Sequence, residues 1–306
     1  MNAGVRAAAV AAVAALASGV AVELWCRAAE RDVEWLADGR VFRTRPGAHG
    51  TGPDGWRAPL PAEGARVDVV VLGDSMTWGP PDAPDAAWPA RWAAATGLRV
   101  VNLAHFGYDA AQVYATWEAV GRHLRPRAVV WATCTNDVVP TALLSLGGKP
   151  AWIGPSLLPR PLAPLHGLSA GVRAAEGAIA ARRYAADPDP LARERPDWGF
   201  FEASLGRLVE ALGPTPLTLY TLPPWSLVGP RESCDARAGG VDGRCALQRS
   251  ILDGQARRGA AAGARVVDPT ELLTDPDAGS RPLDDWLHPT EEGHTQLAHV
   301  AASNLP

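Results

Sequence analysis

Residues 67–76 read VDVVVLGDSM, and this stretch decides the fold. Its nearly continuous apolar run, residues 67–72, is typical of a strand buried on both faces of a parallel sheet. The Gly-Asp-Ser sequence that follows is typical of a turn from a strand into a helix, where Asp or Ser caps the helix. The stretch therefore predicts a buried strand, a tight turn and the start of a helix.

Similar apolar runs follow along the chain and alternate with helical patterns. The predicted strands are 98–103, 128–133, 216–222 and 265–267, and the predicted helices are 87–95, 109–123, 200–212, 246–262 and 290–302. Asp109 and Gln112 have the spacing of a capping box at the start of their helix. Strands alternating with helices imply parallel pairing and right-handed crossovers. We therefore expect an α/β fold with ligands bound beyond the carboxyl ends of its strands.

Composition narrows the class of protein. The chain has 306 residues, of which 47% are hydrophobic and 20% charged, as in globular proteins and unlike disordered ones. That length suits one sizeable α/β domain or two small domains. The formal net charge is −4 and there is no basic block, so we expect no nucleic-acid partner.

The N-terminal segment has the pattern of a membrane anchor or a signal peptide. Residues 7–22 carry no charge, and apolar side chains extend the run to residue 26. We expect residues 7–25 to contact a membrane and residues 1–26 to be an uncleaved anchor or, less favoured, a cleaved signal. The remainder is then extracytoplasmic, held by a single N-terminal helix or secreted. A buried Ala-rich helix is the alternative.

Changes in composition suggest the domain boundaries. Residues 27–65 have the pattern of a polar stalk whose second half is rich in Gly and Pro, and residues 66–306 carry the predicted sheet. An insertion at about 139–196 interrupts the alternation, first Pro-rich and apolar, then rich in Ala and Arg. Such an insertion is either a lid facing substrate or a surface excursion.

The cysteines and histidines give no support for a metal site or an organic cofactor. Cys234 and Cys245 bracket a Gly-rich loop and can form a disulfide in an oxidising compartment. Cys134 is expected to be an inert core thiol. His294 and His299 are five residues apart on the last predicted helix, which places them on different faces. No C-x-x-C is present.

Polar groups that suit nucleophilic catalysis follow the predicted strands. Ser75 follows the first strand, Gly107 the second and Asn136 the third, and Asp285 and His288 lie near the C-terminus. A serine becomes a nucleophile when a base takes its proton and a third group fixes the tautomer of the base. We predict that Ser75 attacks, His288 takes the proton and Asp285 orients the imidazole. The N–H groups of Ser75 and Gly107 and the Asn136 amide would form an oxyanion hole.

Together these blocks resemble the SGNH (GDSL-type) hydrolase superfamily: Gly-Asp-Ser at 73–75, then Gly107, then Asn136 beside an Asp, then D-x-x-H at 285–288. The resemblance covers about residues 66–303 and implies a three-layer α/β/α sandwich around a parallel, flavodoxin-like sheet, with a catalytic domain over residues 66–306. The N-terminal segment resembles that of bacterial membrane-anchored members. Cys134 stands where the third block usually has glycine. The larger side chain can shift Asn136 or narrow the acyl pocket.

The resemblance implies a serine esterase or O-acyltransferase that works through an acyl-Ser75 intermediate. The expected substrate is an O-acyl ester, acetyl above all, of an envelope glycan, or another small-molecule or lipid ester. Water as acceptor gives an esterase, and a sugar hydroxyl gives a transferase. The alternatives are a lipase-type carboxylic ester hydrolase and a non-catalytic binding or assembly protein on the same fold.

Three further residues are candidates for contact with substrate by position alone: Trp78, His105 and Trp152, although His105 is equally able to fill its turn. Ser169, in GLSAG, matches the nucleophile elbow of α/β-hydrolases, but the Pro-rich stretch before it is incompatible with the central strand that the elbow needs. Residues 50–55, GTGPDG, match a dinucleotide fingerprint, but no predicted strand precedes them.

Overall fold

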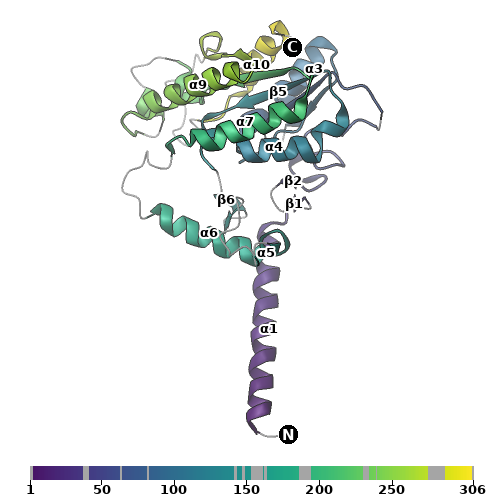
Figure 1. Ribbon diagram of the computed structural model, residues 1–306, viewed down its shortest axis with the longest axis vertical. Coiled ribbons are helices and arrows are strands. Elements are labelled where there is room, and N and C mark those ends of the chain that lie inside the picture. Colours follow the sequence, from purple (N-terminus) through teal and green to yellow (C-terminus); the bar gives the residue numbers. More distant parts are fainter. Residues whose placement is uncertain are drawn as a thin grey trace. The chain divides into compact units, whose positions relative to one another are not determined.

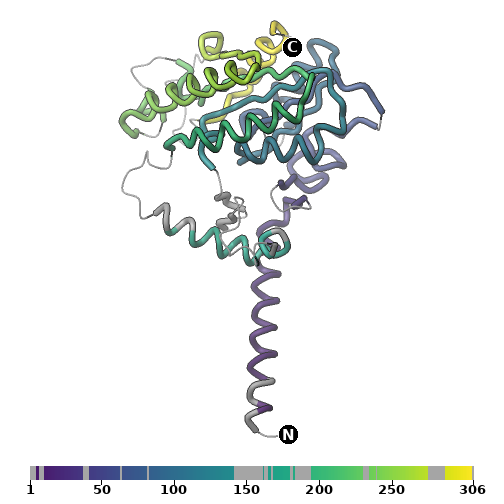
Figure 2. Tube along the Cα trace, viewed as in Figure 1, coloured from purple at the N-terminus to yellow at the C-terminus, as the bar shows by residue number. Residues whose placement is uncertain are grey.

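The structure is a computed structural model that describes most of the chain. Figure 2 draws the other residues in grey, together with a few residues for which only the backbone is described. The described residues are 3–36, 41–62, 64–80, 83–140, 143–146, 149–152, 161, 164–185, 194–229, 234–238, 240–274 and 287–304.

The chain divides into two compact units. Unit 1 comprises Met1–Arg45 and Ala142–Ala186, and unit 2 comprises Pro46–Thr141 and Asp187–Pro306. The segment predicted as a stalk is therefore shared: residues 27–45 belong to unit 1, and the Gly/Pro-rich residues 46–65 belong to unit 2. Most of the predicted insertion falls in unit 1.

The described strands of unit 2 form one parallel sheet of five, in the order β4-β3-β5-β8-β9 (Figure 1). The strands are β3 (Val69–Gly73), β4 (Val100–Asn102), β5 (Ala128–Thr133), β8 (Leu217–Thr221) and β9 (Arg265–Val267). In this order the second strand of the sheet along the chain lies outside the first, as in flavodoxin-like sheets. The predicted fold class is confirmed.

Helices cover both faces of the sheet. On one face, α3 (Trp88–Thr96) and α10 (Glu291–Ser303) contribute Trp88, Trp92 and Leu297 to a core that also holds Val71 and Val130 of the sheet. Helices α4 (Ala110–Ala119), α7 (Trp198–Leu212) and α9 (Arg244–Ala261) cover the other face. The layers are therefore α/β/α.

Local sequence signals explain where these helices begin. The predicted capping box is present at the start of α4: the Asp109 side chain accepts the N–H of Gln112, and the Gln112 side chain accepts the N–H of Asp109. On α7, the Asp197 carboxylate accepts the N–H of Phe200. Phe201 packs its ring 5.4 Å from that of Trp131 in β5, which seats α7 on the sheet.

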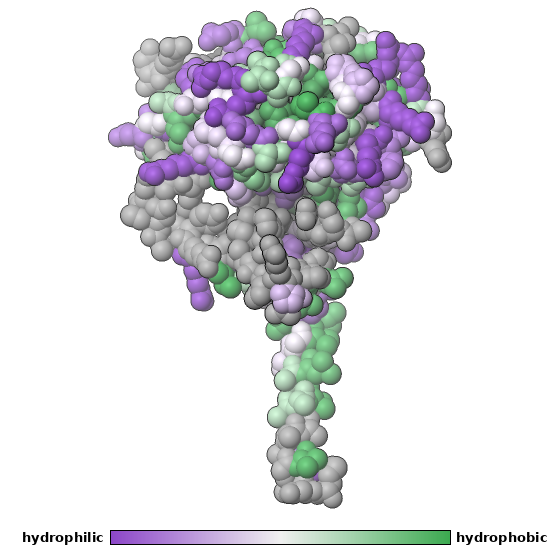
Figure 3. Space-filling view, viewed as in Figure 1, coloured by the Kyte–Doolittle hydropathy of each residue, from purple (hydrophilic) through white to green (hydrophobic). Residues whose placement is uncertain are grey.

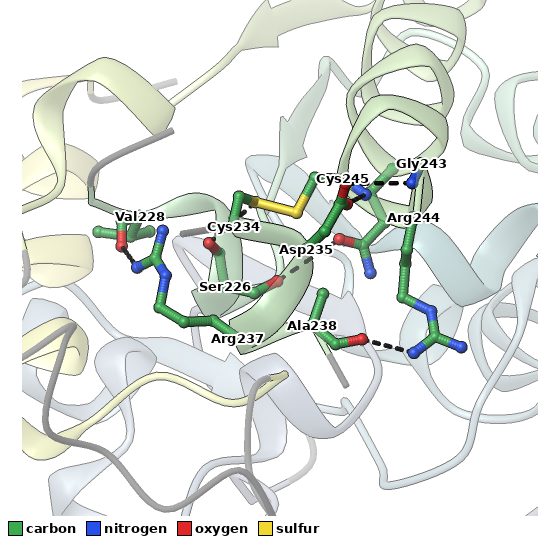
Figure 4. The surroundings of a disulfide bond; sticks show 10 residues. Ser226, Val228, Cys234, Asp235, Arg237, Ala238, Gly243, Arg244 and Cys245 are labelled. Carbon is green, nitrogen blue, oxygen red and sulfur yellow. Dashed lines mark hydrogen bonds between the residues drawn. A yellow bond between two sulfur atoms is a disulfide. The ribbon is translucent and has the colours of Figure 1, made fainter. Parts of the chain in front are cut away.

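A disulfide joins Cys234, the first residue of α8 (Cys234–Arg237), to Cys245 in α9 (Figure 4). The Asp235 carboxylate accepts the N–H groups of Gly243 and Cys245, which closes the same loop a second time. The other two cysteines, Cys26 and Cys134, are buried and take no part in this disulfide. The loop thus contains the disulfide that the cysteine spacing permits.

Unit 1 combines one long helix, a small hairpin from residues 33–44 and the elements of the insertion. These are α1 (Ala3–Ala29), the hairpin of β1 (Val33–Trp35) and β2 (Phe42–Thr44), the hairpin of β6 (Leu143–Leu146) and β7 (Lys149–Trp152), α5 (Pro164–Leu168) and α6 (Ala170–Ala185). Within α1, Val10–Ala29 is long and apolar enough to cross a membrane, with a mean hydropathy of 1.5 and 6% of it buried. Such a helix is compatible with a signal anchor or a signal peptide.

A buried ion pair and a buried hydrogen bond hold elements of unit 1 together. The guanidinium of Arg173 in α6 contacts the Glu30 carboxylate, just after α1, at 2.6 Å, with side chains only 3% and 9% exposed. The same guanidinium lies 4.4 Å from the ring centroid of Trp35. His166 Nδ1 and Glu176 Oε2 form a second buried contact at 2.6 Å. Because a buried charge without its partner is costly, the pair of Arg173 and Glu30 fixes how α6 packs on the end of α1. The contact between His166 and Glu176 joins α5 to α6.

We expect Glu30→Ala to destabilise unit 1 by about 3–5 kcal/mol, because the variant removes the carboxylate that contacts the buried Arg173 charge. Hydrogen exchange of the α6 amides measures the loss as faster exchange, with the strands of unit 2 as internal reference. Arg31→Ala is the matched control, since the Arg31 side chain is 80% exposed. Equal protection of α6 in Glu30→Ala and wild type would contradict the role given to this pair.

Candidate active site

Ser75 is the first residue of the short helix α2 (Ser75–Trp78) and directly follows the turn that ends β3. Asp74 caps this helix, because its Oδ1 accepts the Met76 N–H at 3.0 Å. Gly73 is required by close packing: a Cβ at this position would lie 2.7 Å from the Ala132 carbonyl oxygen of the neighbouring strand. The turn therefore places the Ser75 hydroxyl and N–H beyond the carboxyl end of the sheet.

Ser75 and His288 meet although they are far apart in the sequence. The distance from Ser75 Oγ to His288 Nε2 is 2.8 Å, a normal hydrogen bond for a hydroxyl and an imidazole. His288 lies just before α10, whose cap Thr290 accepts the N–H of Gly293 at 3.0 Å. Both Ser75 and His288 are half-buried. Asp285, predicted to orient the imidazole, lies outside the described residues.

The two other predicted oxyanion donors follow the strands on either side of β3. Gly107, after β4, has a φ of 72°, in the left-handed region that favours glycine. Asn136 lies after β5 in a single 3₁₀ turn, Thr135–Val138. Its Nδ2 donates to the Tyr108 carbonyl at 3.2 Å, which ties this turn to the one that holds Gly107. Because β3 lies between β4 and β5, both groups flank the nucleophile position.

Two carboxyl groups, Asp74 and Asp137, are fully buried beneath the site. Burial raises the pKa of Asp74 to about 6, although a backbone hydrogen bond and the nearby His288 oppose the shift. Burial, together with the charge of Asp74, also raises the pKa of Asp137. Its Oδ2 accepts the N–H of Cys134 at 2.8 Å and so fixes the third sequence block.

Cys134 packs into the apolar core of unit 2, with a fully buried side chain. Burial, and the charges of Asp74 and Asp137, raise the pKa of its thiol well above the ordinary value. A thiol that stays protonated and buried is a poor nucleophile. The cysteine at the usual glycine position of the third block therefore contributes packing, as predicted for a core thiol.

A cavity of about 530 Å³ opens beside Ser75 and His288. Its volume lies in the range of small-molecule sites. The residues that line it are His49, Ser75, Trp78, Gly79, Pro80, Phe106, His288, Pro289 and His294. The wall thus combines two aromatic rings with three imidazoles around one hydroxyl.

The three predicted substrate-contact residues have different positions. Trp78 lines the cavity. His105 lies behind the wall, fully buried, with its ring 5.8 Å from that of Trp78. Burial lowers the pKa of His105 to about 3, so this imidazole is neutral and fills its turn. The backbone of Trp152 lies in β7 of unit 1, and its side chain is outside the described residues.

Sequence reasoning missed a wall contributed by the Gly/Pro-rich segment. Arg57, 5% exposed, donates from Nε to the Trp78 carbonyl at 2.9 Å, from Nη1 to the His49 carbonyl at 2.7 Å, and from Nη2 to the Pro80 carbonyl. Its guanidinium carbon lies 4.2 Å from the ring centroid of Trp78. The dipeptide of Trp56 and Arg57 was the available signal, because a large aromatic residue is unusual in a solvated linker.

His49 has a positive φ of 49°, which a non-glycine residue adopts only when its surroundings enforce it. The enforcing contacts are the Arg57 hydrogen bond to its carbonyl and the ring of Trp78, 6.5 Å away. This strained backbone presents the imidazole to the cavity.

His294, which the sequence places on a different face of the last helix from His299, is 2% exposed and lines the cavity. Its Nδ1 is buried and has no hydrogen-bond partner within the described part of the chain. Burial, helped by the charge of Arg91, lowers the pKa of His294 to about 4, so the ring is neutral near pH 7. Among the residues that the structure describes, no group of three or more His, Cys, Asp and Glu side chains is arranged to hold a metal ion.

Ser169, the serine of the elbow-like motif, has a structural role in unit 1. Its hydroxyl donates to Glu23 Oε2 at 2.7 Å and accepts the N–H of Val172 at 3.1 Å. It therefore caps α6, and the described residues just before it, 161 and 164–168, contain no strand.

The sequence model of the GDSL-like lipase/acylhydrolase family matches residues 71–296. The chain belongs to this family. The match spans the sequence blocks of Ser75, Gly107, Asn136 and His288, and it begins after the segment that carries His49 and Arg57. Family membership supports ester hydrolysis as the class of reaction.

Several solved structures are similar to this chain at low identity. A member of the lipolytic G-D-S-L family from Veillonella parvula is 13% identical, with a TM-score of 0.46 over 78% of this chain and 97% of that one. A lipase/acylhydrolase from Enterococcus faecalis is 16% identical, with a TM-score of 0.44 over 78% and 98%. A carbohydrate acetylesterase family member from Sinorhizobium meliloti is 14% identical, with a TM-score of 0.42 over 78% and 97%. No curated protein matches the sequence.

The buried His294 makes the fold sensitive to acid. Its pKa is about 4 in the folded protein and 6.5 for an ordinary His, so the unfolded chain takes up the proton first as the pH falls. Stability is therefore lost between about pH 6.5 and pH 4. Because Gln does not titrate, the free energy of unfolding of His294→Gln should fall by on the order of 3 kcal/mol less than that of wild type over this interval. Denaturant titrations at a series of pH values measure the difference. The exposed His299→Gln on the same helix is the control, and identical losses in the two variants would refute the effect.

Arg57→Lys should lower the stability of unit 2 by on the order of 2–3 kcal/mol, because an ammonium cannot serve three carbonyls in the fixed fork of a guanidinium. The midpoint of thermal unfolding measures the loss. Arg66→Lys is the control, since the Arg66 side chain is 66% exposed and pairs with Asp68 at the surface. An unchanged midpoint in Arg57→Lys would show that the wall does not depend on the clamp.

Proposed function

We propose that this GDSL-family protein is a serine ester hydrolase with Ser75 as its nucleophile and His288 as its base. The observation that carries the proposal is the 2.8 Å contact between Ser75 Oγ and His288 Nε2 at the wall of a cavity that can hold a small ester. The family match supports the same reaction class.

In the proposed reaction, Ser75 passes its hydroxyl proton to His288 Nε2 as Oγ attacks the ester carbonyl. The carbonyl oxygen becomes an oxyanion, which the N–H groups of Ser75 and Gly107 and the amide of Asn136 stabilise. The tetrahedral intermediate collapses to an acyl-Ser75 ester, and the departing alcohol oxygen takes the proton from His288. Asp285 is proposed to hold the imidazole in the required tautomer.

Water or a second hydroxyl then resolves the acyl-enzyme. His288 takes a proton from the acceptor, the acceptor oxygen attacks the acyl carbon, and Ser75 regains its proton. With water the product is a free acid, and with a sugar hydroxyl it is a new ester. The two outcomes differ only in which acceptor occupies the cavity beside the acyl group.

The proposed substrate is a short O-acyl ester, acetyl above all, of a glycan. The cavity combines the aromatic rings of Trp78 and Phe106 with the imidazoles of His49 and His294. Aromatic rings pack against sugar rings, and imidazoles exchange hydrogen bonds with sugar hydroxyls, so this wall suits a hydroxylated alcohol group. A lipase-type activity on long acyl chains is the competing possibility.

We further propose that α1 anchors the protein in a membrane, with the rest outside the cytoplasm. The supports are the length and hydropathy of α1 and the disulfide between Cys234 and Cys245, which persists in oxidising compartments. The catalytic domain proposed for residues 66–306 then works as an anchored extracytoplasmic esterase.

A fluorophosphonate probe tests the nucleophile directly, because it labels a serine activated by its base. Wild type should be labelled and Ser75→Ala should not, with hydrolysis of p-nitrophenyl acetate falling by about 10⁴-fold or more. Ser169→Ala is the control and should keep full labelling, since that hydroxyl caps a helix. Absence of labelling in well-folded wild type would favour a non-catalytic binding protein.

The length of the preferred acyl chain separates the two substrate classes. We expect p-nitrophenyl acetate to be hydrolysed with a higher kcat/KM than the octanoate ester. The reverse order would replace the glycan-ester proposal by the lipase-type one and leave the Ser75 nucleophile intact.

A further inference from the structure

Exposed apolar side chains gather in unit 1. Across the described part of the chain, every large apolar residue with strong exposure lies on α1, α5 or α6, except Leu272 in unit 2. Figure 3 shows the part of this surface on α1 in green. On α5, Leu165 is 43% exposed and Leu168 is 70% exposed. Apolar side chains gathered in this way mark a surface that meets a partner or a membrane.

The charges on α1 locate the end of a membrane span. Residues 7–22 carry no charge and rise about 24 Å at 1.5 Å per residue, somewhat less than the roughly 30 Å of a hydrocarbon core. Arg6 can reach the headgroups at one end. At the other end, Glu23 and Arg27 pair with each other at 2.7 Å. For an α1 that crosses a membrane, this places the headgroup region at the level of residues 22–27.

The start of α6 and the end of α5 lie at this same level. The Glu23 carboxylate accepts the N–H of Gly171 at 2.9 Å, and a Cβ on Gly171 would lie 3.9 Å from a methyl carbon of Val22. Arg27 Nη2 donates to the Leu168 carbonyl at 2.9 Å. In Figure 1, α6 runs across the end of α1, the orientation of a helix in the plane of a membrane on a helix that crosses it.

We propose that α5 and α6, here called the collar (residues 164–185), lie in the headgroup region of the lipid bilayer crossed by α1. Leu165 and Leu168 dip into the lipid, as interfacial helices do with their apolar side chains. Arg27 and the exposed Arg182 face the lipid phosphates. This proposal rests on the membrane anchoring proposed above.

Continuity with α1 favours lipid as the occupant of this surface. The collar cannot leave the level of Val22 without breaking the buried pair of Arg173 and Glu30 and the contacts to Glu23. The insertion therefore works as a brace that fixes the anchor helix at the membrane surface.

The test uses the full chain in vesicles of phosphatidylcholine with phosphatidylglycerol. A single environment-sensitive fluorophore is attached at Leu168→Cys, with Leu165→Cys as a second collar position. Leu16→Cys reports on the span and Leu272→Cys on an exposed leucine of unit 2, 71% and 60% exposed. Labelled wild type gives the background, since Cys26 and Cys134 are buried. Iodide quenches from water, and lipids with a nitroxide near the headgroup quench from the interface.

We expect the collar fluorophores to emit at shorter wavelength than the Leu272 fluorophore, with severalfold weaker iodide quenching and strong quenching by the nitroxide lipid. Collar fluorophores as open to iodide as the Leu272 one, beside a lipid-buried Leu16, would overturn the collar and leave the anchor intact. A Leu16 fluorophore in water would overturn both. Shielding of Leu168 that grows with the protein-to-lipid ratio would assign the surface to a second copy of the chain.

Discussion

The parallel pairing of β3 between β4 and β5 is the constraint on which the candidate site depends. It aligns Val71 with Asn102 on one side and Gly73 with Ala132 on the other, so the three strands end at one edge. The groups that follow these strands must then meet whatever their separation in the sequence. The register tolerates only glycine at 73, because any Cβ would press on the Ala132 carbonyl.

Beneath this edge the fold buries acidic groups that the proposed reaction does not use as acids or bases. Asp74 caps α2 and Asp137 holds the Cys134 N–H, so each carboxyl fixes the backbone of a catalytic block. Burial raises the pKa of both carboxyl groups, because their charged forms are desolvated. The site is therefore positioned by buried hydrogen bonds rather than by surface charge pairs, which contribute little.

The segment before the family domain completes the cavity. Arg57 fastens it to the α2 region, and His49 adds an imidazole that the residues matched to the family do not supply. Unit 1 also contains a buried guanidinium that joins two segments, because Arg173 pairs with Glu30 and so connects the insertion to the end of α1. In both places a buried guanidinium holds separate segments of the chain together. The rigid fork of donors in a guanidinium suits this role, because it can bind several acceptors at once.

Patterns along the chain determined the α/β class, the positions of the sheet strands and of the helices that cover the sheet to within a few residues, and Ser75, Gly107, Asn136 and His288 as candidates. Those inferences work because strand burial, helix caps and catalytic blocks are local patterns. Only the tertiary structure decided that His288 reaches Ser75, that His105 is buried behind the cavity, and that His49, Arg57 and His294 build its wall. Their roles depend on contacts between distant segments, and a Gly/Pro-rich segment looks the same in sequence whether it is solvated or packed against a site.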